Sequence, residues 1–190
     1  MSDNIILLGS GVTAADCPFD KEVWGCNNTI RTEKKVDKHF FFDDLATFNP
    51  EVMHIQDLIG NSHETEHITT FKNAQLCSRI GVLATVYPID EVIRKFGRAY
   101  FANTVCYMIA YAMYMGIKKM NLYGIDHLTW QSYIVERCGV EYWLGRAEQS
   151  GIEIDIAEGS ALLKTLDGKL YGYETFYGSP KTTYNEIVQV

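Results

Sequence analysis

The chain has 190 residues, of which 47% are hydrophobic and 22% are charged. These values are typical of one ordinary globular domain, and they exclude a disordered or fibrous chain. The formal net charge of −7 argues against a surface built to grip a nucleic-acid backbone, because such surfaces cluster Lys and Arg, although it leaves a local basic pocket open.

The cysteine pattern indicates a reducing compartment. The five cysteines include no Cys-x-x-Cys pair, and their odd number and spacing match neither a disulfide framework nor a zinc site: Cys17, Cys26, Cys77, Cys106 and Cys138. We therefore expect reduced thiols in a cytoplasmic protein. No basic and apolar leader is visible at the N-terminus, and the longest apolar stretch, 105–115, falls far short of the roughly 20 residues that a membrane span needs.

Short apolar runs that end in turn residues predict buried strands, with helical spacing between several of them. In chain order we expect strands at 5–8, 22–26, 39–42 and 81–87, helices at 89–96 and 103–115, a strand at 119–123, a helix at 140–150 and a strand at 152–156. The segment 103–115 is apolar on almost every side, which predicts a buried helix with Asn103 or Thr104 as N-cap and Gly116 beyond its end. Buried strands that alternate with helices predict an α/β fold: a three-layer Rossmann-like domain with a mostly parallel doubly wound sheet.

Residues 1–165 are expected to form this single domain. The segment 51–78 is polar and carries His54, His63 and His67, so we interpret it as an irregular insertion or lid. Its His63–His67 stretch satisfies the His-Glu-x-x-His pattern of zinc proteases but lacks the long amphipathic helix that such a site needs. Residues 166–190, rich in Gly, Tyr and Thr, are expected to form a C-terminal arm or hairpin.

Ligands of open α/β sheets bind beyond the carboxyl ends of the strands. Gly9, Ser10 and Gly11 follow the first strand and either bring backbone amides close to a phosphate or make a tight turn. No Gly-x-Gly-x-x-Gly motif is completed, because Ala14 occupies the third glycine position. Asn27 follows the second strand and either reads a nucleoside or forms a turn.

Further along the chain, Asp43 and Asp44 either bind a metal, act as a base or cap a helix. Asn103 and Thr104 open the buried helix, whose N-terminus holds a phosphate without Lys or Arg, or they are a plain cap.

An acid and an imidazole stand together after the 119–123 strand. Asp126 and His127 suit acid–base work or a metal. Arg137 pairs either with a phosphate or with Glu141 four residues on.

The order of these motifs resembles the sialyltransferase-like glycosyltransferases of bacteria and their small phage-encoded relatives, which include proteins related to 6-hydroxymethylpterin pyrophosphokinase. Four stretches carry the resemblance, which spans about residues 4–160: the glycine loop 7–11, the strand and Asn at 24–27, the helix, strand and Gly-Ile-Asp of 103–127, and the helix and strand of 141–156.

The resemblance implies a Rossmann-like domain that binds a nucleotide or nucleotide sugar. Carried over residue by residue, the nucleotide-binding positions would be Gly9, Ser10, Gly11, Asn27, Asn103 and Thr104. Tyr133 falls near a tyrosine that steadies the leaving phosphate in the family, whereas the other family tyrosine is replaced by Leu128 and the catalytic histidine has no evident counterpart.

The sequence thus predicts a nucleotide-sugar-dependent glycosyltransferase-like enzyme. A metal-free route would use Tyr133 and Arg137, and a route with a divalent metal would recruit Asp43, Asp44 or Asp126. The acceptor would be a glycan or a modified nucleobase, and a homo-oligomer stays open. The alternatives are a nucleotide-binding module or sponge without turnover, and a nucleotide-cleaving hydrolase that uses Asp126 and His127.

Overall fold

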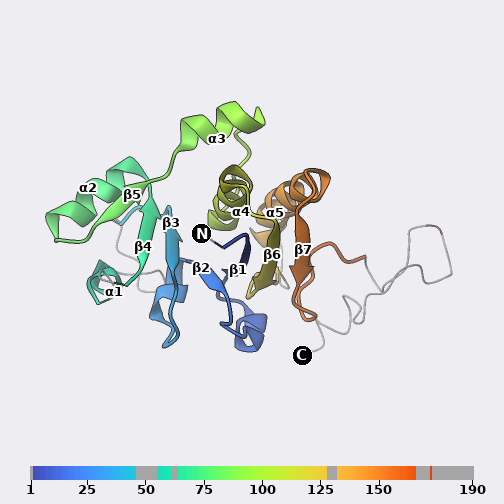
Figure 1. The fold of residues 1–190 in the computed structure, drawn as a ribbon, viewed down its shortest axis with the longest axis horizontal. Helices are drawn as coiled ribbons and strands as arrows, with labels where there is room; N and C mark the ends of the chain where they lie inside the picture. The colour runs from blue at the N-terminus through green and yellow to red at the C-terminus, as the bar shows by residue number, and fades with distance from the viewer. Residues whose placement is uncertain (1, 46–54, 61–63, 128–131, 166–171, 173–190) are drawn as a thin grey trace.

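The computed structural model describes residues 2–45, 55–60, 64–127, 132–165 and 172, and for residues 55, 56, 132 and 133 it describes the backbone alone. The helices and strands of these residues are arranged as one open sheet with helices on both faces (Figure 1).

The sheet has seven parallel strands in the described residues, in the order β5-β4-β3-β2-β1-β6-β7. The strands are β1 (Asn4–Leu8), β2 (Glu22–Cys26), β3 (Lys38–Phe41), β4 (Glu66–Thr69), β5 (Ala84–Val86), β6 (Lys119–Tyr123) and β7 (Glu153–Ile156). The order runs outward from β1 to β5 and then returns to the other side of β1 with β6. The switch point of this doubly wound sheet therefore lies between β1 and β6.

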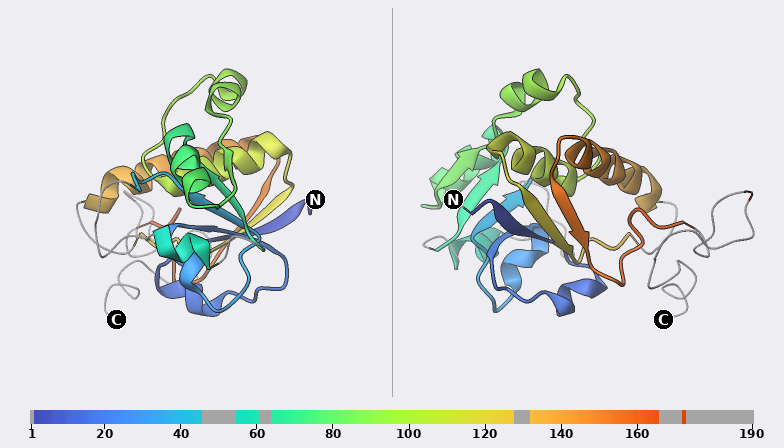
Figure 2. Two further views of the ribbon diagram at one scale, coloured as in Figure 1. Left: turned by 90° about the vertical axis from the view of Figure 1, so that its left-hand side faces the viewer. Right: turned by 45° about the vertical axis from the view of Figure 1, so that its right-hand side comes forward.

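The helices divide between the two faces. They are η1 (Val12–Asp16), η2 (Asn27–Arg31), α1 (Ile55–Ile59), α2 (Phe71–Arg79), α3 (Ile89–Phe96), α4 (Thr104–Met115) and α5 (Ser132–Gln149), where η marks a 3₁₀ helix. In Figure 2, α4 and α5 cover one face of the sheet, while η1, η2 and α1 lie on the other. The predicted three-layer α/β fold with a parallel doubly wound sheet is confirmed.

Each strand contributes side chains to the cores on both faces of the sheet, because successive side chains point to opposite faces. Ile5 and Leu7 of β1 pack in the large cluster with α4, whereas Ile6 and Leu8 pack in a smaller cluster on the η1 face. The buried helix is also confirmed: α4 is buried along most of its length, and the Asn103 side chain caps it by accepting a hydrogen bond from the Cys106 amide at 3.1 Å. Gly116 ends it in the left-handed conformation.

The expectation of irregular structure in 51–78 is wrong for much of the segment, which contributes α1, strand β4 and most of α2. The apolar pattern of the sequence does not indicate β4, because the buried side chains of this strand include the polar residues His67 and Thr69 as well as apolar ones. The position of His67 on a strand also removes the helix that a zinc-protease interpretation of 63–67 requires. His54 and His63 lie outside the described residues, as does all of the 166–190 segment except Gly172.

Two other element boundaries differ from expectation. The strand expected at 81–87 is limited to Ala84–Val86, and the helix expected to begin at residue 140 begins at 132. The first turns of this helix contain the apolar but exposed residues Ile134 and Val135, which interrupt the amphipathic pattern that would predict its start. No helix among the described residues has both the length and the apolar character needed to cross a membrane.

Candidate functional site

The loops after β1 and β6 are in direct backbone contact at the switch point. The Gly9 amide donates to the Tyr123 carbonyl and the Gly11 amide to the Gly124 carbonyl, both at 2.8 Å. A side chain at Gly9 would collide with the Gly124 carbonyl, and one at Gly11 with the Asp126 carboxylate. These glycines therefore serve close loop packing. Their own amides are already engaged, which leaves those of Ser10 and Val12 as the loop amides that no other described group engages.

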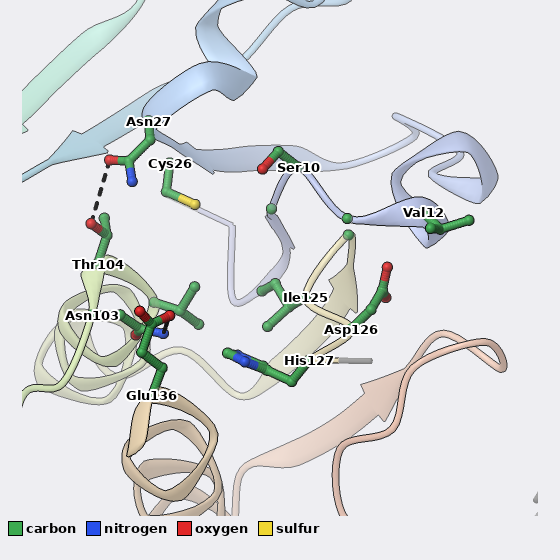
Figure 3. Close-up of a pocket in the computed structure, with 14 residues that line it drawn as sticks. Ser10, Val12, Cys26, Asn27, Asn103, Thr104, Ile125, Asp126, His127 and Glu136 are labelled. Atoms are coloured by element: carbon green, nitrogen blue, oxygen red, sulfur yellow. Dashed lines mark hydrogen bonds between the residues drawn. The ribbon is translucent and has the colours of Figure 1, made fainter. Parts of the chain in front are cut away.

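A cavity of about 440 Å³ lies beyond these strand ends, bordered by the β1 and β6 loops, the end of β2, the start of α4 and the side of α5 (Figure 3). Its lining residues are Gly9, Ser10, Gly11, Val12, Cys26, Asn27, Asn103, Thr104, Val105, Gly124, Ile125, Asp126, His127 and Glu136. The structure thus brings the predicted glycine loop, Asn27 and the Asn103–Thr104 helix start to one cavity, together with Asp126 and His127.

Asn27 connects two elements of the cavity wall. It begins η2 with a left-handed φ of 47°, and its side-chain oxygen accepts a hydrogen bond from the Thr104 hydroxyl at 3.4 Å. Its backbone carbonyl accepts a second hydrogen bond, at 2.8 Å, from Nε2 of His39. The amide group of Asn27 therefore lies at the cavity surface next to the helix N-terminus.

Asp126 is buried and turned toward η1, away from the cavity (Figure 3). Its carboxylate accepts hydrogen bonds from the Thr13 amide, at 2.9 Å, and from the Thr13 hydroxyl. The same hydroxyl accepts a hydrogen bond from the Gly124 amide at 2.8 Å. The carboxylate therefore joins the β6 loop to η1, which gives it a positioning role.

His127 points its ring into the cavity (Figure 3) from a backbone with a left-handed φ of 48°. Burial lowers the pKa of the imidazole, and the nearby Arg137 charge lowers it further, against the opposing effects of Glu141 and Asp126. A lowered pKa keeps the ring neutral at neutral pH. In that form His127 is able to accept a proton from a bound ligand.

Glu136 is a charged residue of the cavity lining that the sequence motifs do not include. It projects from α5 toward the start of α4, where its carboxylate accepts a hydrogen bond from the Asn103 side chain at 3.4 Å. Its position four residues before buried Val140 places it on the inward side of the helix. That signal becomes visible only when the helix is known to begin before residue 140.

Cys26 also lines the cavity, but not as a nucleophile. Burial raises the pKa of its thiol to about 12, and the nearby Asp43 charge adds to the effect. The protonated sulfur lies 3.6 Å from the Leu8 carbonyl and donates to it. Cys26 is thus a small, unreactive part of the wall.

Several predicted residues lie elsewhere. Of the two alternatives for Arg137, the structure shows the pair with Glu141, at 2.8 Å, and a further bond to the Ala161 carbonyl. Arg137 is not among the residues that line the cavity. The side chain of Tyr133 lies outside the described residues, although its backbone belongs to the first turn of α5.

The acidic pair after β3 does not border the cavity either. Asp44 forms an ion pair with Lys72 at 2.6 Å, and the Asp43 carbonyl accepts a hydrogen bond from the Asn73 side chain. Within the described ranges, no group of three or more His, Cys, Asp or Glu side chains is arranged to hold a metal ion.

Comparison with known proteins supports the fold. No protein-family model and no curated protein matches the sequence. Among solved structures, the chain is similar to the sialyltransferase CstII from Campylobacter jejuni in complex with the substrate analogue cytidine-5'-monophosphate (19% identity, 82% of this chain and 79% of that chain, TM-score 0.54). The complex of CstII with CMP-3FNeuAc gives 18% identity, 82% and 81% coverage and a TM-score of 0.54.

A third match is an alpha-2,3-sialyltransferase from Campylobacter jejuni in apo form, with 17% identity, 82% and 75% coverage and a TM-score of 0.51. Identities this low establish a shared architecture and leave activity to be argued from the site. The chain therefore has a sialyltransferase-like α/β fold, with its cavity at the switch point of the sheet.

Proposed function

We propose that this protein is a nucleotide-sugar-dependent glycosyltransferase-like enzyme whose donor binds in the switch-point cavity. The observation that carries the proposal is the meeting of the β1 loop, Asn27 and the N-terminus of α4 around one cavity. The fold adds support, since similar solved structures were determined with cytidine-5'-monophosphate and with CMP-3FNeuAc.

The donor phosphate would be held without a basic side chain from the described part of the chain, where no Lys or Arg lines the cavity. The N-terminus of a helix attracts an anion through its unpaired amides and its partial positive charge. The first-turn amides of α4 at Thr104 and Val105 would supply these contacts, together with the loop amides of Ser10 and Val12. The Glu136 carboxylate repels an anion on the Asn103 side, which favours a phosphate between Ser10 and Thr104.

Asn27 would bind the nucleoside. A side-chain amide offers a donor and an acceptor together, which suits the edge of a base or the hydroxyls of a ribose. Its present bond to the Thr104 hydroxyl is long, at 3.4 Å, so a ligand exchanges it at little cost. Asn27 would thus contact the nucleoside beside the N-terminus of α4, which would hold the phosphate. This arrangement fits a nucleotide, in which the nucleoside and the phosphate are linked.

His127 would act as the general base. Its neutral ring would take the proton from an acceptor hydroxyl as that oxygen attacks the anomeric carbon of the donor sugar. The bond from that carbon to the phosphate oxygen breaks, and the nucleotide leaves with both electrons of the bond. Asp126 would hold the β6 loop that carries His127, and Tyr133 would steady the leaving phosphate from the start of α5.

Two of the three carboxylates that a metal route would recruit already have other partners, which favours a metal-free route. Asp126 is bonded to Thr13, and Asp44 is paired with Lys72. The acceptor class, a glycan or a modified nucleobase, stays a prediction, as do the arm at 166–190, the lid role of 51–78, the homo-oligomer and the phage and pterin pyrophosphokinase links.

The proposal is tested by thermal shift against a panel of nucleotides and nucleotide sugars, followed by product analysis with mono- and disaccharide and modified-nucleoside acceptors. A ligand that binds the folded state raises the melting temperature by mass action. We expect a shift with a nucleotide sugar and release of free nucleotide only when an acceptor is present. Release without an acceptor would instead identify a hydrolase that uses Asp126 and His127, and binding without release would identify a binding module.

A matched pair of variants connects turnover to the site. His127→Gln keeps a polar side chain at the cavity but removes the base, so we expect it to bind nucleotide as the wild type does and to lose about a hundredfold or more in turnover. Cys138→Ser is the control, because Cys138 is exposed and does not line the cavity. Equal turnover in the two variants would remove His127 from the mechanism.

A further inference from the structure

Two buried histidines stand behind the cavity, and the proposed chemistry uses neither of them. His39 of β3 and His67 of β4 are register partners on neighbouring strands, and both side chains are buried. Their rings meet edge to face, with 5.5 Å between centroids, and Phe41 stacks on His39 at 5.3 Å. They lie in an apolar layer where a polar group needs a reason to be present.

The hydrogen bonds of the pair fix a tautomer for each ring. Nε2 of His39 lies 2.8 Å from the Asn27 carbonyl oxygen, which only accepts, so this nitrogen carries the proton. Burial lowers the pKa of His39 to about 3 and that of His67 to about 4, so both rings are neutral at neutral pH. Nδ1 of neutral His39 is then an acceptor, and Nδ1 of His67, 3.3 Å away, must donate to it. The two bonds run in one direction, from His67 through His39 to Asn27.

The far end of this chain has no donor among the described residues. With its proton on Nδ1, His67 has an acceptor lone pair on Nε2, and no described group donates a hydrogen bond to this buried atom. A buried acceptor without a donor lowers stability, whereas apolar residues of similar shape would leave no such cost. Fold stability alone therefore does not account for the pair, while its near end is bonded to a cavity residue.

That residue has a left-handed backbone conformation. Asn27 has a φ of 47°, in a region that residues other than glycine adopt infrequently and that Asn adopts more readily than most of them. The bond from His39 holds its carbonyl in place, and the same backbone conformation directs its side chain to Thr104 at the cavity. The two rings are thus connected by hydrogen bonds to the backbone of a residue that lines the cavity.

We propose that His39 and His67 form a positioning pair that fixes the backbone of Asn27, and with it the direction of the Asn27 side chain in the nucleotide site. The inference rests on the proposed function, because it assigns the pair to a residue that would contact the nucleoside. Both histidines act through Asn27 and touch no ligand.

The first test needs no ligand. Long-range ¹⁵N–¹H NMR spectra of the full chain report which imidazole nitrogen carries the proton. We expect the Nε2–H tautomer for His39 and the Nδ1–H tautomer for His67 at neutral pH. The opposite tautomer at His39 would overturn the proposal, because that ring would then have no proton to donate to Asn27.

The second test separates positioning from packing with matched variants. A glutamine amide places an N–H near the position of Nε2, and an asparagine amide places one near Nδ1, so His39→Gln and His67→Asn keep the donors, while His39→Met and His67→Leu remove them. With a nucleotide that binds the wild type, we expect His39→Met to weaken binding about five- to tenfold and His39→Gln to restore most of it. His67→Leu is expected to weaken binding less than His39→Met, and His67→Asn to restore it.

The outcomes distinguish the two hypotheses. Nucleotide binding by the wild type with equal affinity in His39→Met, and unchanged Cα and Cβ chemical shifts of Asn27, would overturn the positioning pair and leave the proposed function intact. A wild type that binds no nucleotide would overturn the proposed function, while the tautomers and the Asn27 shifts still report whether the pair holds that backbone. If His39→Met does not fold, the His39→Gln affinity and the wild-type tautomers decide.

Discussion

The two walls of the cavity differ in how completely their polar groups are bonded. The wall made by the β1 and β6 loops is held by bonds from the Gly9 and Gly11 amides to the Tyr123 and Gly124 carbonyls, at 2.8 Å, and from the Thr13 amide to Asp126, at 2.9 Å. On the opposite wall the bonds between side chains are longer, at 3.4 Å, from Thr104 to Asn27 and from Asn103 to Glu136, although His39 holds the backbone carbonyl of Asn27 at 2.8 Å. Short bonds between buried groups fix a scaffold, whereas long ones leave side chains that a ligand engages in exchange. The first wall thus positions the site, and the second is the surface that would recognise a ligand.

The largest expected effect concerns the support behind the second wall. Burial holds the pKa of His39 and His67 at about 3 and 4, below the usual value of 6.5, while the Asn27 carbonyl and Asp57 raise that of His39 and His67 itself lowers it. Folding therefore favours the neutral rings, and this stability is complete above pH 6.5 and is lost as the pH falls toward 4 and 3. The slope approaches about 1.4 kcal/mol per pH unit for each histidine.

Urea unfolding between pH 7 and pH 4 measures this loss. The His39→Met, His67→Leu double variant is the control, because it retains every carboxylate and lacks both rings. We expect a shallower decline in its free energy of unfolding below pH 6.5. Parallel profiles for the two proteins would contradict the prediction, because they would mean that folding does not lower the pKa of either ring.

The next effect tests the scaffold wall. Asp126→Ala leaves the Thr13 amide and hydroxyl without their buried acceptor, and we expect it to lower the free energy of unfolding by about 2–4 kcal/mol. Glu136→Ala is the matched control, since it removes a carboxylate from the recognition wall. We expect it to cost less than about 1 kcal/mol, because its bond to Asn103 is long and partly exposed. Similar losses in urea unfolding would show that the two walls do not differ as described.

The contrast between the walls also explains what the sequence reveals and what it hides. The glycines and Asp126 follow apolar strands directly, so chain order alone places them at one edge of the sheet. The sequence also predicts the Asn103 cap, because an Asn directly before an apolar helical run is commonly the N-cap of that helix. Local patterns of this kind were sufficient for the fold class and for most of the residues around the cavity.

The missing parts depend on contacts between distant residues. Glu136 meets Asn103 across 33 positions, and His39 meets His67 across 28. Histidine inside a strand interrupts the apolar pattern by which a buried strand is recognised, so the sequence predicts irregular structure where β4 lies. The role of Asp126 was hidden for the same reason: its partner Thr13 is 113 residues away.

A smaller effect is expected from the recognition wall itself. Thr104→Val removes the hydroxyl that donates to Asn27 and retains the shape of the side chain. Because that bond is long, we expect a change in the free energy of unfolding of less than about 1 kcal/mol. Nucleotide affinity should fall about three- to tenfold, because the hydroxyl that the ligand would release from Asn27 is then missing beside the phosphate.

Calorimetric titration with the nucleotide that gives the largest thermal shift measures this change. Thr85→Val is the control: Thr85 bonds to Glu66 at an exposed site of β5, far from the cavity lining. The same loss of affinity in both variants would assign the effect to general destabilisation rather than to the site.

The smallest effect has the opposite sign. Glu136 places a negative charge beside the N-terminus of α4, where the ligand phosphate would benefit from the helix dipole. Glu136→Gln removes the charge and keeps an oxygen that accepts from Asn103. We expect the affinity for a nucleoside monophosphate to rise about two- to fivefold, with a smaller gain at high salt because screening weakens the repulsion in the wild type. The uncharged nucleoside should bind both proteins equally, since it carries no phosphate to repel. Weaker binding of the monophosphate by Glu136→Gln would show instead that the carboxylate contacts the ligand directly, and the phosphate would then have to lie outside the reach of α4.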